Sequence, residues 1–424
     1  MRVDLPFGRE LLPIEVPDYA TVLRPNPTAS TLGPVEAIRD ALRNPIAGPP
    51  LTERVNPGDD VAIVVSDITR PVPNQTLLGP ILHDLKAAGV SERDVTIVNG
   101  TGLHRECTDE ELREMLGSDL PKRLRIVQHV ARDRSTLVEV GRSSRGVPVE
   151  FCRAYVEADV RIVTGFVEPH LFAGYSGGAK GVMPGVAGAD IVMSNHGAAN
   201  LSHPEASWCK THGNPVWEEI QATVALCPPH FLLNVTIDTE RRVTGIFAGD
   251  LAEAHDKAVQ QAASQYQVPI GHPYDVVVVT NMGYPADTTF YQSVKGMSVA
   301  AEAVRDGGAI VLVAGCVEGI GSDDYVAGLH EAGSPRGLLS LIYADERTPR
   351  HDQWQIQCQA IAQAKATVYA HTKISFGDTR TCHVEYSADP SQTVRDLVEA
   401  ARARGREGSV LVMPHGQLTV PVIR

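Results

Sequence analysis

VRIVTGF, at residues 160–166, is an almost unbroken run of apolar and β-branched residues that leads directly into a polar, glycine-rich segment. Five further runs share this character: VAIVVSD (61–67), VTIVNGTG (95–102), YDVVVVTNMG (274–283), AIVLVAGC (309–316) and SVLVMPHG (409–416). A strand with one solvent-exposed face alternates apolar and polar residues, whereas these runs do not alternate. They are therefore typical of strands buried on both faces, as in parallel sheets covered by helices.

Helix-compatible stretches lie between these runs, at residues 74–89, 109–117, 213–226 and 250–266. Alternating strands and helices predict an α/β fold with mostly parallel sheets flanked by helices. The 424 residues suffice for two domains, and we expect the active site in the cleft between them. The boundary is expected within QVPIGHPYD (267–275), which gives an N-terminal domain of residues 1–268 and a C-terminal domain of residues 269–424. The sequence leaves open whether the closing LTVPVIR (418–424) returns to the N-terminal domain.

The composition excludes several classes of partner. Asp and Glu number 51 against 38 Lys and Arg, and the net charge of -13 disfavours binding to nucleic acid or anionic lipid. The first residues, MRVDLPFGRE, lack the apolar core of a signal peptide, and no apolar run reaches the length of a membrane span. The seven cysteines are scattered without a CxxC pair. We therefore expect a cytoplasmic protein with buried, reduced thiols.

Polar clusters follow two of the predicted strands. SDITRPVPN (66–74) contains Asp67, which suits a ligand hydroxyl or a turn cap, and Arg70, whose planar fork suits a carboxylate or phosphate. NGTGLHREC (99–107) places His104 just after two glycines, where it can exchange protons near neutral pH. The alternatives at this point are a rigid loop with a surface arginine and a structural loop histidine.

The most informative cluster is GFVEPHLFAGYSGGAKGVMPGVAG (165–188), which carries His170 and, within its glycines, Lys180. Glycine-rich backbone can approach a phosphate or a bulky cofactor closely, although the spacing matches neither a Walker A loop nor GxGxxG. His196 follows in MSNHGAANLSHPEA (193–206). No second His or Cys lies two to four residues from His196, so a zinc site made only of protein ligands has weak support. His196 could instead be one ligand of a metal that is held mainly by an organic cofactor.

In the second predicted domain, TNMGYPADTTFYQSVKGM (280–297) places Tyr291, Gln292 and Lys295 within about one helical turn. Facing Arg70, Gln292 and Lys295 would form a clamp for a small carboxylate; the alternative is a capped or solvated helix face. Trp354 is a candidate wall of the cleft, or simply a core residue.

Together these segments resemble the lactate racemase family, the enzymes that use a nickel-pincer nucleotide. SDITRPVP, GTGLHR, EPHLFAGYSGGAKGVMPG, SNHG and YQSVKGM occur in the family's order, and the resemblance covers essentially the whole chain. It implies a cofactor, pyridinium-3,5-bisthiocarboxylic acid mononucleotide, attached to Lys180 through a thioamide. Nickel would be bound by two sulfurs and a ring carbon of that cofactor and by His196.

The resemblance also implies roles for the other clusters. His104 and His170 would be the catalytic acid/base pair, and the segment Asp67, Ile68, Thr69 and Arg70 would meet the cofactor, with Arg70 also contacting substrate. Substrate would further contact Tyr291, Gln292, Lys295 and Trp354. The implied reaction is racemisation or epimerisation of a small 2-hydroxy acid, lactate or a close relative, by reversible hydride transfer through a 2-keto acid. Accessory proteins that make the cofactor are the implied partners. A non-catalytic cofactor carrier and a zinc-dependent hydrolase remain as alternatives.

Overall fold

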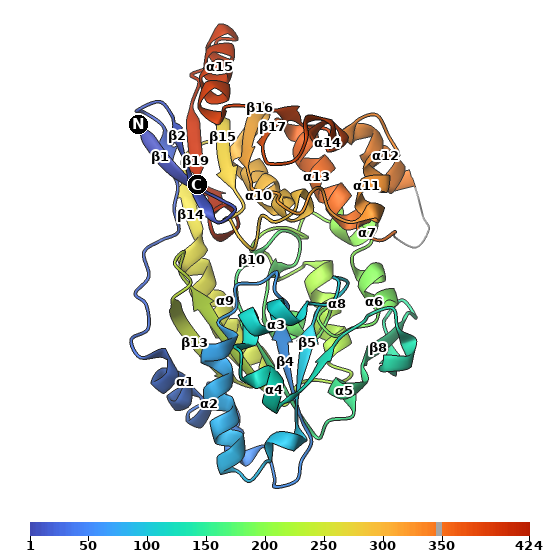
Figure 1. Cartoon of the computed structure of the whole chain (residues 1–424). Helices are drawn as coiled ribbons and strands as arrows, with labels where there is room; N and C mark the ends of the chain where they lie inside the picture. The colour runs from blue at the N-terminus through green and yellow to red at the C-terminus, as the bar shows by residue number, and fades with distance from the viewer. Residues whose placement is uncertain (345–349) are drawn as a thin grey trace.

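The computed structural model describes residues 1–344 and 350–424, which form two α/β units, each built around a six-stranded sheet (Figure 1). In the first sheet every neighbouring pair is parallel except β12 and β13, which are antiparallel. Its strand order is β13 (Val243–Gly249), β12 (Phe231–Ile237), β9 (Val160–Phe166), β4 (Val61–Ser66), β5 (Val95–Gly100) and β6 (Arg125–Gln128).

Both faces of the first sheet are buried. Ile63 and Val65 of β4 pack into one apolar cluster, whereas Ala62 and Val64 pack into another on the opposite face. The first cluster includes residues of α1 (Pro34–Arg43), α2 (Asn74–Ala87) and α9 (Leu251–Tyr266). The second includes residues of α5 (Arg153–Val156), α6 (Ala189–Asn195) and α8 (Pro215–Val224). This double covering explains why the strands read as continuous apolar runs.

The second sheet is parallel throughout. Its order is β18 (Glu385–Tyr386), β17 (Thr367–His371), β16 (Val304–Val313), β15 (Tyr274–Thr280), β19 (Val410–Met413) and β3 (Thr21–Val22). One face packs on α10 (Phe290–Ala303) and α13 (Gln353–Lys365). The other packs on α15 (Pro390–Ala403) and on a hairpin of β1 (Arg2–Phe7) and β2 (Glu10–Glu15) (Figure 1).

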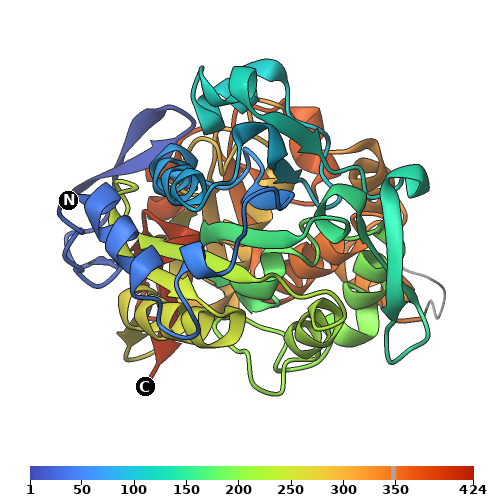
Figure 2. The ribbon, with the colours of Figure 1, turned by 90° about the horizontal axis from the view of Figure 1, so that it is seen from below.

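Both ends of the chain cross the expected division at residue 268. Strand β3 belongs to the second sheet and the hairpin packs against that sheet, although the expected division places residues 1–22 in the first domain. At the other end, β20 (Val420–Ile423) pairs in parallel with β14 (Gln267–Ile270), the segment that links the two units. A two-residue strand such as β3 gives no periodic signal in the sequence, because its position is set by the free edge of β19. Figure 2 looks at the molecule from below, so that the elements of the first unit lie in front of those of the second.

The predicted fold class is confirmed, and the four predicted helices correspond to α2, α3 (Asp109–Leu116), α8 and α9. No described helix combines the length and hydropathy needed to cross a bilayer. The remaining elements are α4 (Leu120–Arg123), β7 (Leu137–Arg142), β8 (Pro148–Cys152), β10 (Pro169–His170), β11 (Gly174–Tyr175), α7 (Ala198–Leu201), α11 (Asp323–Leu329), α12 (Pro335–Ala344) and α14 (Phe376–Thr381).

Candidate active site

Three adjacent strands of the first sheet, β9, β4 and β5, deliver the polar clusters to one edge. Because the strands are parallel, the segments that follow their carboxyl ends lie side by side. Helix α10 of the second unit faces this edge. One cavity lies within the first unit beside Lys180, and two lie between the units; neighbouring cavities share the wall residues Arg70, His104, Lys180, Tyr291 and Gln292. Every site residue predicted from the sequence lines these cavities: Asp67, Ile68, Thr69, Arg70, His104, His170, Lys180, His196, Tyr291, Gln292, Lys295 and Trp354.

His104 is oriented by Asp67. The loop that carries it turns at Gly102, whose φ of +58° favours glycine and whose backbone N–H donates to the Gly185 carbonyl at 2.9 Å. Nδ1 of His104 lies 2.8 Å from Asp67 Oδ2. A carboxylate only accepts hydrogen bonds, so Nδ1 donates and the lone pair of the neutral ring lies on Nε2. His104 is thereby set to act as a base toward the cavity.

Asp67 is a buried carboxylate with several partners. Thr69 Oγ1 donates to its Oδ1 at 2.8 Å, while His104 occupies Oδ2. Burial acts to raise the pKa of Asp67, but His104, Arg70 and Thr69 together hold that pKa below its usual value. Asp67 is therefore a fixed negative charge behind the His104 ring.

His170 lies on the short hairpin of β10 and β11 and is almost completely buried. Its Nδ1 accepts from the backbone N–H groups of Ala173 at 3.3 Å and Phe172 at 3.5 Å. These contacts are long for hydrogen bonds, so they orient the ring without fixing its tautomer. Burial, with positive charges on Lys180 and Arg70 acting in the same direction, lowers the pKa of His170 well below its usual value. The ring is thus neutral in the free protein.

Lys180 lies in a tight turn that only glycine-rich sequence allows. Gly177 has a φ of +73°, and a Cβ there would come within 2.6 Å of Asn234 Oδ1. That same oxygen accepts from the N–H of Gly178 at 2.8 Å, which fixes the turn. Burial and the neighbouring Arg70 lower the pKa of Lys180 to about 7. A large fraction of this amine is therefore uncharged, and nucleophilic, at neutral pH.

His196 caps the C-terminus of α6 with a free ring nitrogen. Its Nδ1 lies 3.1 Å from Asn195 Oδ1, which accepts the ring proton and leaves the Nε2 lone pair available. The ring stands edge-to-face against Phe172 and Trp354, with centroid distances of 4.8 and 5.5 Å. Burial, followed by the charge of Lys180, lowers the pKa of His196 to about 3. A neutral, oriented imidazole is the form that ligates metals.

The second unit contributes a polar face of α10. Thr289 caps this helix and accepts from the Gln292 N–H at 3.2 Å. One turn on, Lys295 Nζ donates to Gln292 Oε1 at 2.9 Å, so both side chains point the same way. Burial and Arg70 lower the pKa of Lys295 to about 7. Tyr291 accepts from Trp354 Nε1 at 3.1 Å, which joins α10 to α13 at the cavity wall.

Several residues at the site were missed as functional candidates. Asn195 orients His196 and directly precedes it in the sequence. Its position next to a candidate metal ligand could have indicated this role. Glu168 lies within the glycine-rich segment of residues 165–188. Its carboxylate faces Arg70, with 4.0 Å between Arg70 Nε and Glu168 Oε1. Asp352, in the second unit, lines the cavity beside Trp354 and has no motif around it. Only the tertiary structure brings that residue to the site.

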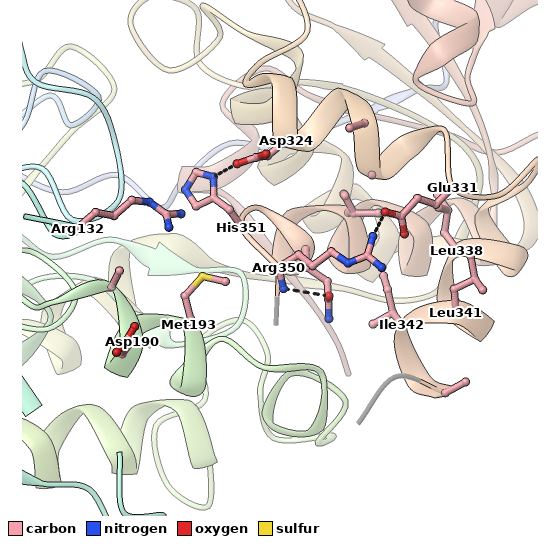
Figure 3. A pocket seen from close by; sticks show the side chains of 16 residues that line it. Arg132, Asp190, Met193, Asp324, Glu331, Leu338, Leu341, Ile342, Arg350 and His351 are labelled. Carbon is pink, nitrogen blue, oxygen red and sulfur yellow. Dashed lines mark hydrogen bonds and ion pairs between the residues drawn. The ribbon is translucent and has the colours of Figure 1, made fainter. Parts of the chain in front are cut away.

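A separate cavity lies between α6 and the helices α11, α12 and α13 (Figure 3). His351 lies on its wall with Nδ1 3.2 Å from Asp324 Oδ2, while Arg350 forms an ion pair with Glu331. None of the sequence-predicted site residues lines this cavity. It shares His351 with the cavity beside Tyr291 and therefore adjoins the candidate active site.

Among residues 1–344 and 350–424, no group of three or more His, Cys, Asp and Glu side chains is arranged to hold a metal ion. A zinc site built only from protein ligands needs three or four such groups. The zinc hydrolase alternative therefore lacks its metal ligands in the described chain.

The fold and site define a two-domain α/β protein whose cleft gathers neutral histidines, amines of low pKa and an arginine, a set suited to proton transfer on an anionic substrate. Models of the lactate racemase N-terminal domain and C-terminal domain match residues 7–209 and 271–422. The chain belongs to the lactate racemase family.

Known relatives match over nearly the full length. A lactate racemase of Thermoanaerobacterium thermosaccharolyticum is 30% identical over 98% of this chain and 97% of its own. One of Lactiplantibacillus plantarum is 31% identical over 98% of each chain. The structure of the T. thermosaccharolyticum lactate racemase apoprotein covers 100% of both chains with a TM-score of 0.90 at 28% identity. A Thermotoga maritima protein shares the fold at 20% identity, with a TM-score of 0.73 over 94% of this chain and 100% of that one.

Proposed function

We propose that this protein racemises or epimerises small 2-hydroxy acids, lactate or a close relative, with a nickel-pincer nucleotide attached to Lys180. The observation that carries the proposal is the convergence of His104, His170, Lys180 and His196 on one interdomain cavity, opposite Lys295. Membership of the lactate racemase family supports the same reaction class.

The residues present fit the cofactor. Lys180 offers a partly buried amine with a pKa of about 7, so that much of it is in the uncharged state required for acylation. His196 offers a free Nε2 for nickel. The part of the cavity around Lys180 is lined by glycines, whose backbone a bound group can approach closely: Gly100, Gly102, Gly165, Gly177, Gly181 and Gly185. When bound, the cofactor supplies an acceptor for the hydrogen of the substrate's Cα as hydride.

The side chains of this chain would bind and orient the substrate. Arg70 and Lys295 would hold its carboxylate, with Gln292 fixing the ammonium of Lys295 through the 2.9 Å hydrogen bond. With the carboxylate held, the planar 2-keto acid reorients by rotation rather than by release. Trp354 and Tyr291, joined by their own hydrogen bond, would wall this space against water.

His104 and His170 would move the hydroxyl proton. Nε2 of His104 accepts that proton while Asp67 stabilises the resulting imidazolium. Two such groups are needed because the two enantiomers direct their hydroxyls to opposite sides.

The low pKa of His170 fits this scheme once charges change. Burial is the largest cause of the lowered pKa of His170, and the positive charges of Lys180, Arg70 and Lys295 lower that pKa further. Acylation removes the charge of Lys180, and a bound carboxylate offsets those of Arg70 and Lys295. The pKa of His170 is therefore expected to rise on loading, into the range where it can exchange a proton.

The Asp67–His104 pair favours an enzyme over a cofactor carrier, because a carrier needs Lys180 and His196 but no oriented base. Co-expression with cofactor-making accessory proteins tests the proposal. We expect an intact-mass increase of nucleotide size and racemisation of one or more acids in a panel of short 2-hydroxy acids. Protein with the full adduct and nickel but no racemisation of any of these acids would contradict it.

A further inference from the structure

His255 is a buried histidine of α9 that lines none of the cavities of the candidate active site. Its Nε2 lies 2.9 Å from the backbone carbonyl oxygen of Ser176. A carbonyl only accepts hydrogen bonds, so Nε2 donates. Burial lowers the pKa of His255, so the ring is neutral at neutral pH. His255 is therefore a neutral donor to the backbone at the start of the Lys180 turn.

The ring of His255 also packs against the turn itself. A Cβ on Gly178 would come within 2.5 Å of His255 Cδ2, so the backbone of Gly178 lies directly against the edge of the ring. A face of the same ring stacks on Trp217 of α8, with 5.2 Å between the ring centroids and an interplanar angle of 25°. His255 is thus confined between the turn and α8, and it has little freedom to move away from either.

The turn that leads to Lys180, residues 176–180, is rich in glycine and takes its shape from contacts with other elements. Asn234 Oδ1, on β12, accepts from the N–H of Gly178 at 2.8 Å. His255 supplies a second contact, from α9, at the start of the turn. Because glycine adopts a wide range of backbone conformations, the loss of such a contact leaves the turn free to take other shapes. The position of Lys180 therefore depends on His255.

The hydrogen bond of His255 is more than simple space filling requires. Alanines occupy other buried positions along α9, namely Ala254, Ala258 and Ala262. An imidazole is larger, and its burial costs free energy unless its N–H group is hydrogen-bonded. We propose that His255 is a positioning residue, which holds the Lys180 turn in the shape that projects the amine into the site cavity. This step rests on the proposed function, in which Lys180 carries the cofactor.

The position of the Lys180 amine and its protonation are linked. Burial, followed by the charge of Arg70, holds the pKa of Lys180 at about 7. If the turn relaxes, the amine gains contact with water and its pKa rises toward the ordinary value of lysine. Removing the N–H of His255 should therefore raise the pH at which Lys180 becomes reactive by about one unit. This midpoint reports the local position of the amine, whereas a general loss of stability would not shift it in the folded protein.

Acetylation of the full-length protein with acetic anhydride, without the cofactor, measures this midpoint when modification of Lys180 is quantified by peptide mass spectrometry over a range of pH. His255→Phe keeps a ring against Trp217 but removes the donor. His255→Gln replaces the ring by an amide whose N–H can still donate to a carbonyl. His371→Phe is the matched control: Nδ1 of His371 lies 2.9 Å from a backbone carbonyl in the second unit, and this residue lines none of the site cavities.

We expect a midpoint near pH 7 in wild type, His255→Gln and His371→Phe, and a midpoint about one unit higher in His255→Phe. An unshifted midpoint in His255→Phe would overturn the inference, as would an equal shift in His255→Gln or in the control, or a wild-type midpoint in the ordinary range of lysine. A His255→Phe protein that does not fold would also overturn it, because His255 would then serve the fold rather than the turn.

The proposed function fails by a different result. Wild-type protein that gains no nucleotide adduct on co-expression with the accessory proteins would contradict that function, while the acetylation profiles of the cofactor-free protein would still stand.

Discussion

Replacing Asp67 by Asn removes the charge that orients His104 while keeping the size of the side chain. Asp67 Oδ2 accepts the Nδ1 proton of His104 at 2.8 Å, and under the proposed mechanism the carboxylate would stabilise the imidazolium formed when Nε2 takes the substrate proton. An amide can present its NH2 group to Nδ1, which would leave the ring proton on Nε2 and block the base. The expected defect is therefore in the chemical step.

The size of the effect follows from the bond that is lost. Hydrogen bonds to charged groups contribute about 1.5–3 kcal/mol, which corresponds to roughly a 10- to 150-fold lower kcat. Thr69→Val is a graded comparison: it removes a neutral donor 2.8 Å from Asp67 Oδ1. That loss of about 1 kcal/mol should lower kcat roughly fivefold.

Initial rates from chiral chromatography, with kcat and KM determined separately, provide the assay. KM should change little, since Asp67 is not expected to hold the substrate carboxylate, and nickel content per chain should match wild type. Asp67→Asn with wild-type kcat would refute the reasoning, as would a defect confined to KM or explained by lost nickel.

Three further outcomes are expected. Lys180→Ala should lose both the nucleotide-sized mass adduct and racemisation, because the only proposed attachment point is gone; an active variant would exclude covalent attachment here. His196→Ala should keep part of the organic adduct but lose nickel and the absorption that depends on it, and unchanged nickel by elemental analysis would mean that another residue is the ligand. His104→Ala and His170→Ala should each abolish racemisation in the chiral assay, since a full cycle uses both; wild-type turnover by either would remove that histidine from the mechanism.

Much of the fold could be predicted because the strands are buried on both faces. The apolar runs of β4, β5, β9 and β15 are unbroken because other elements pack on both faces of each sheet. The positions of β3 and β20 could not be predicted in the same way. They are two and four residues long, and their pairing with β19 and β14 depends on free sheet edges far away in the sequence.

Some residues of the site could likewise be predicted from the sequence, and others could not. His104, His170 and Lys180 follow strand ends within glycine-rich segments, so local sequence indicates them. Asp352 and the orienting role of Asp67 depend on contacts between segments distant in the chain, which no local pattern records. The charge environment of Glu168 likewise exists only once β4, β9 and α10 are assembled.

The central claim is that the hydrogen of Cα leaves as hydride and returns without meeting solvent. Deprotonating Cα of a 2-hydroxycarboxylate would need strong stabilisation of an enediolate, and the site presents no carboxylate cluster among its described residues to hold the metal ions that would provide it. Substrate deuterated at Cα and racemised in ordinary water, with the product analysed by mass spectrometry, tests this claim most directly. The account predicts that the product keeps its deuterium; rapid loss of deuterium to solvent would contradict it and favour a two-base proton racemase.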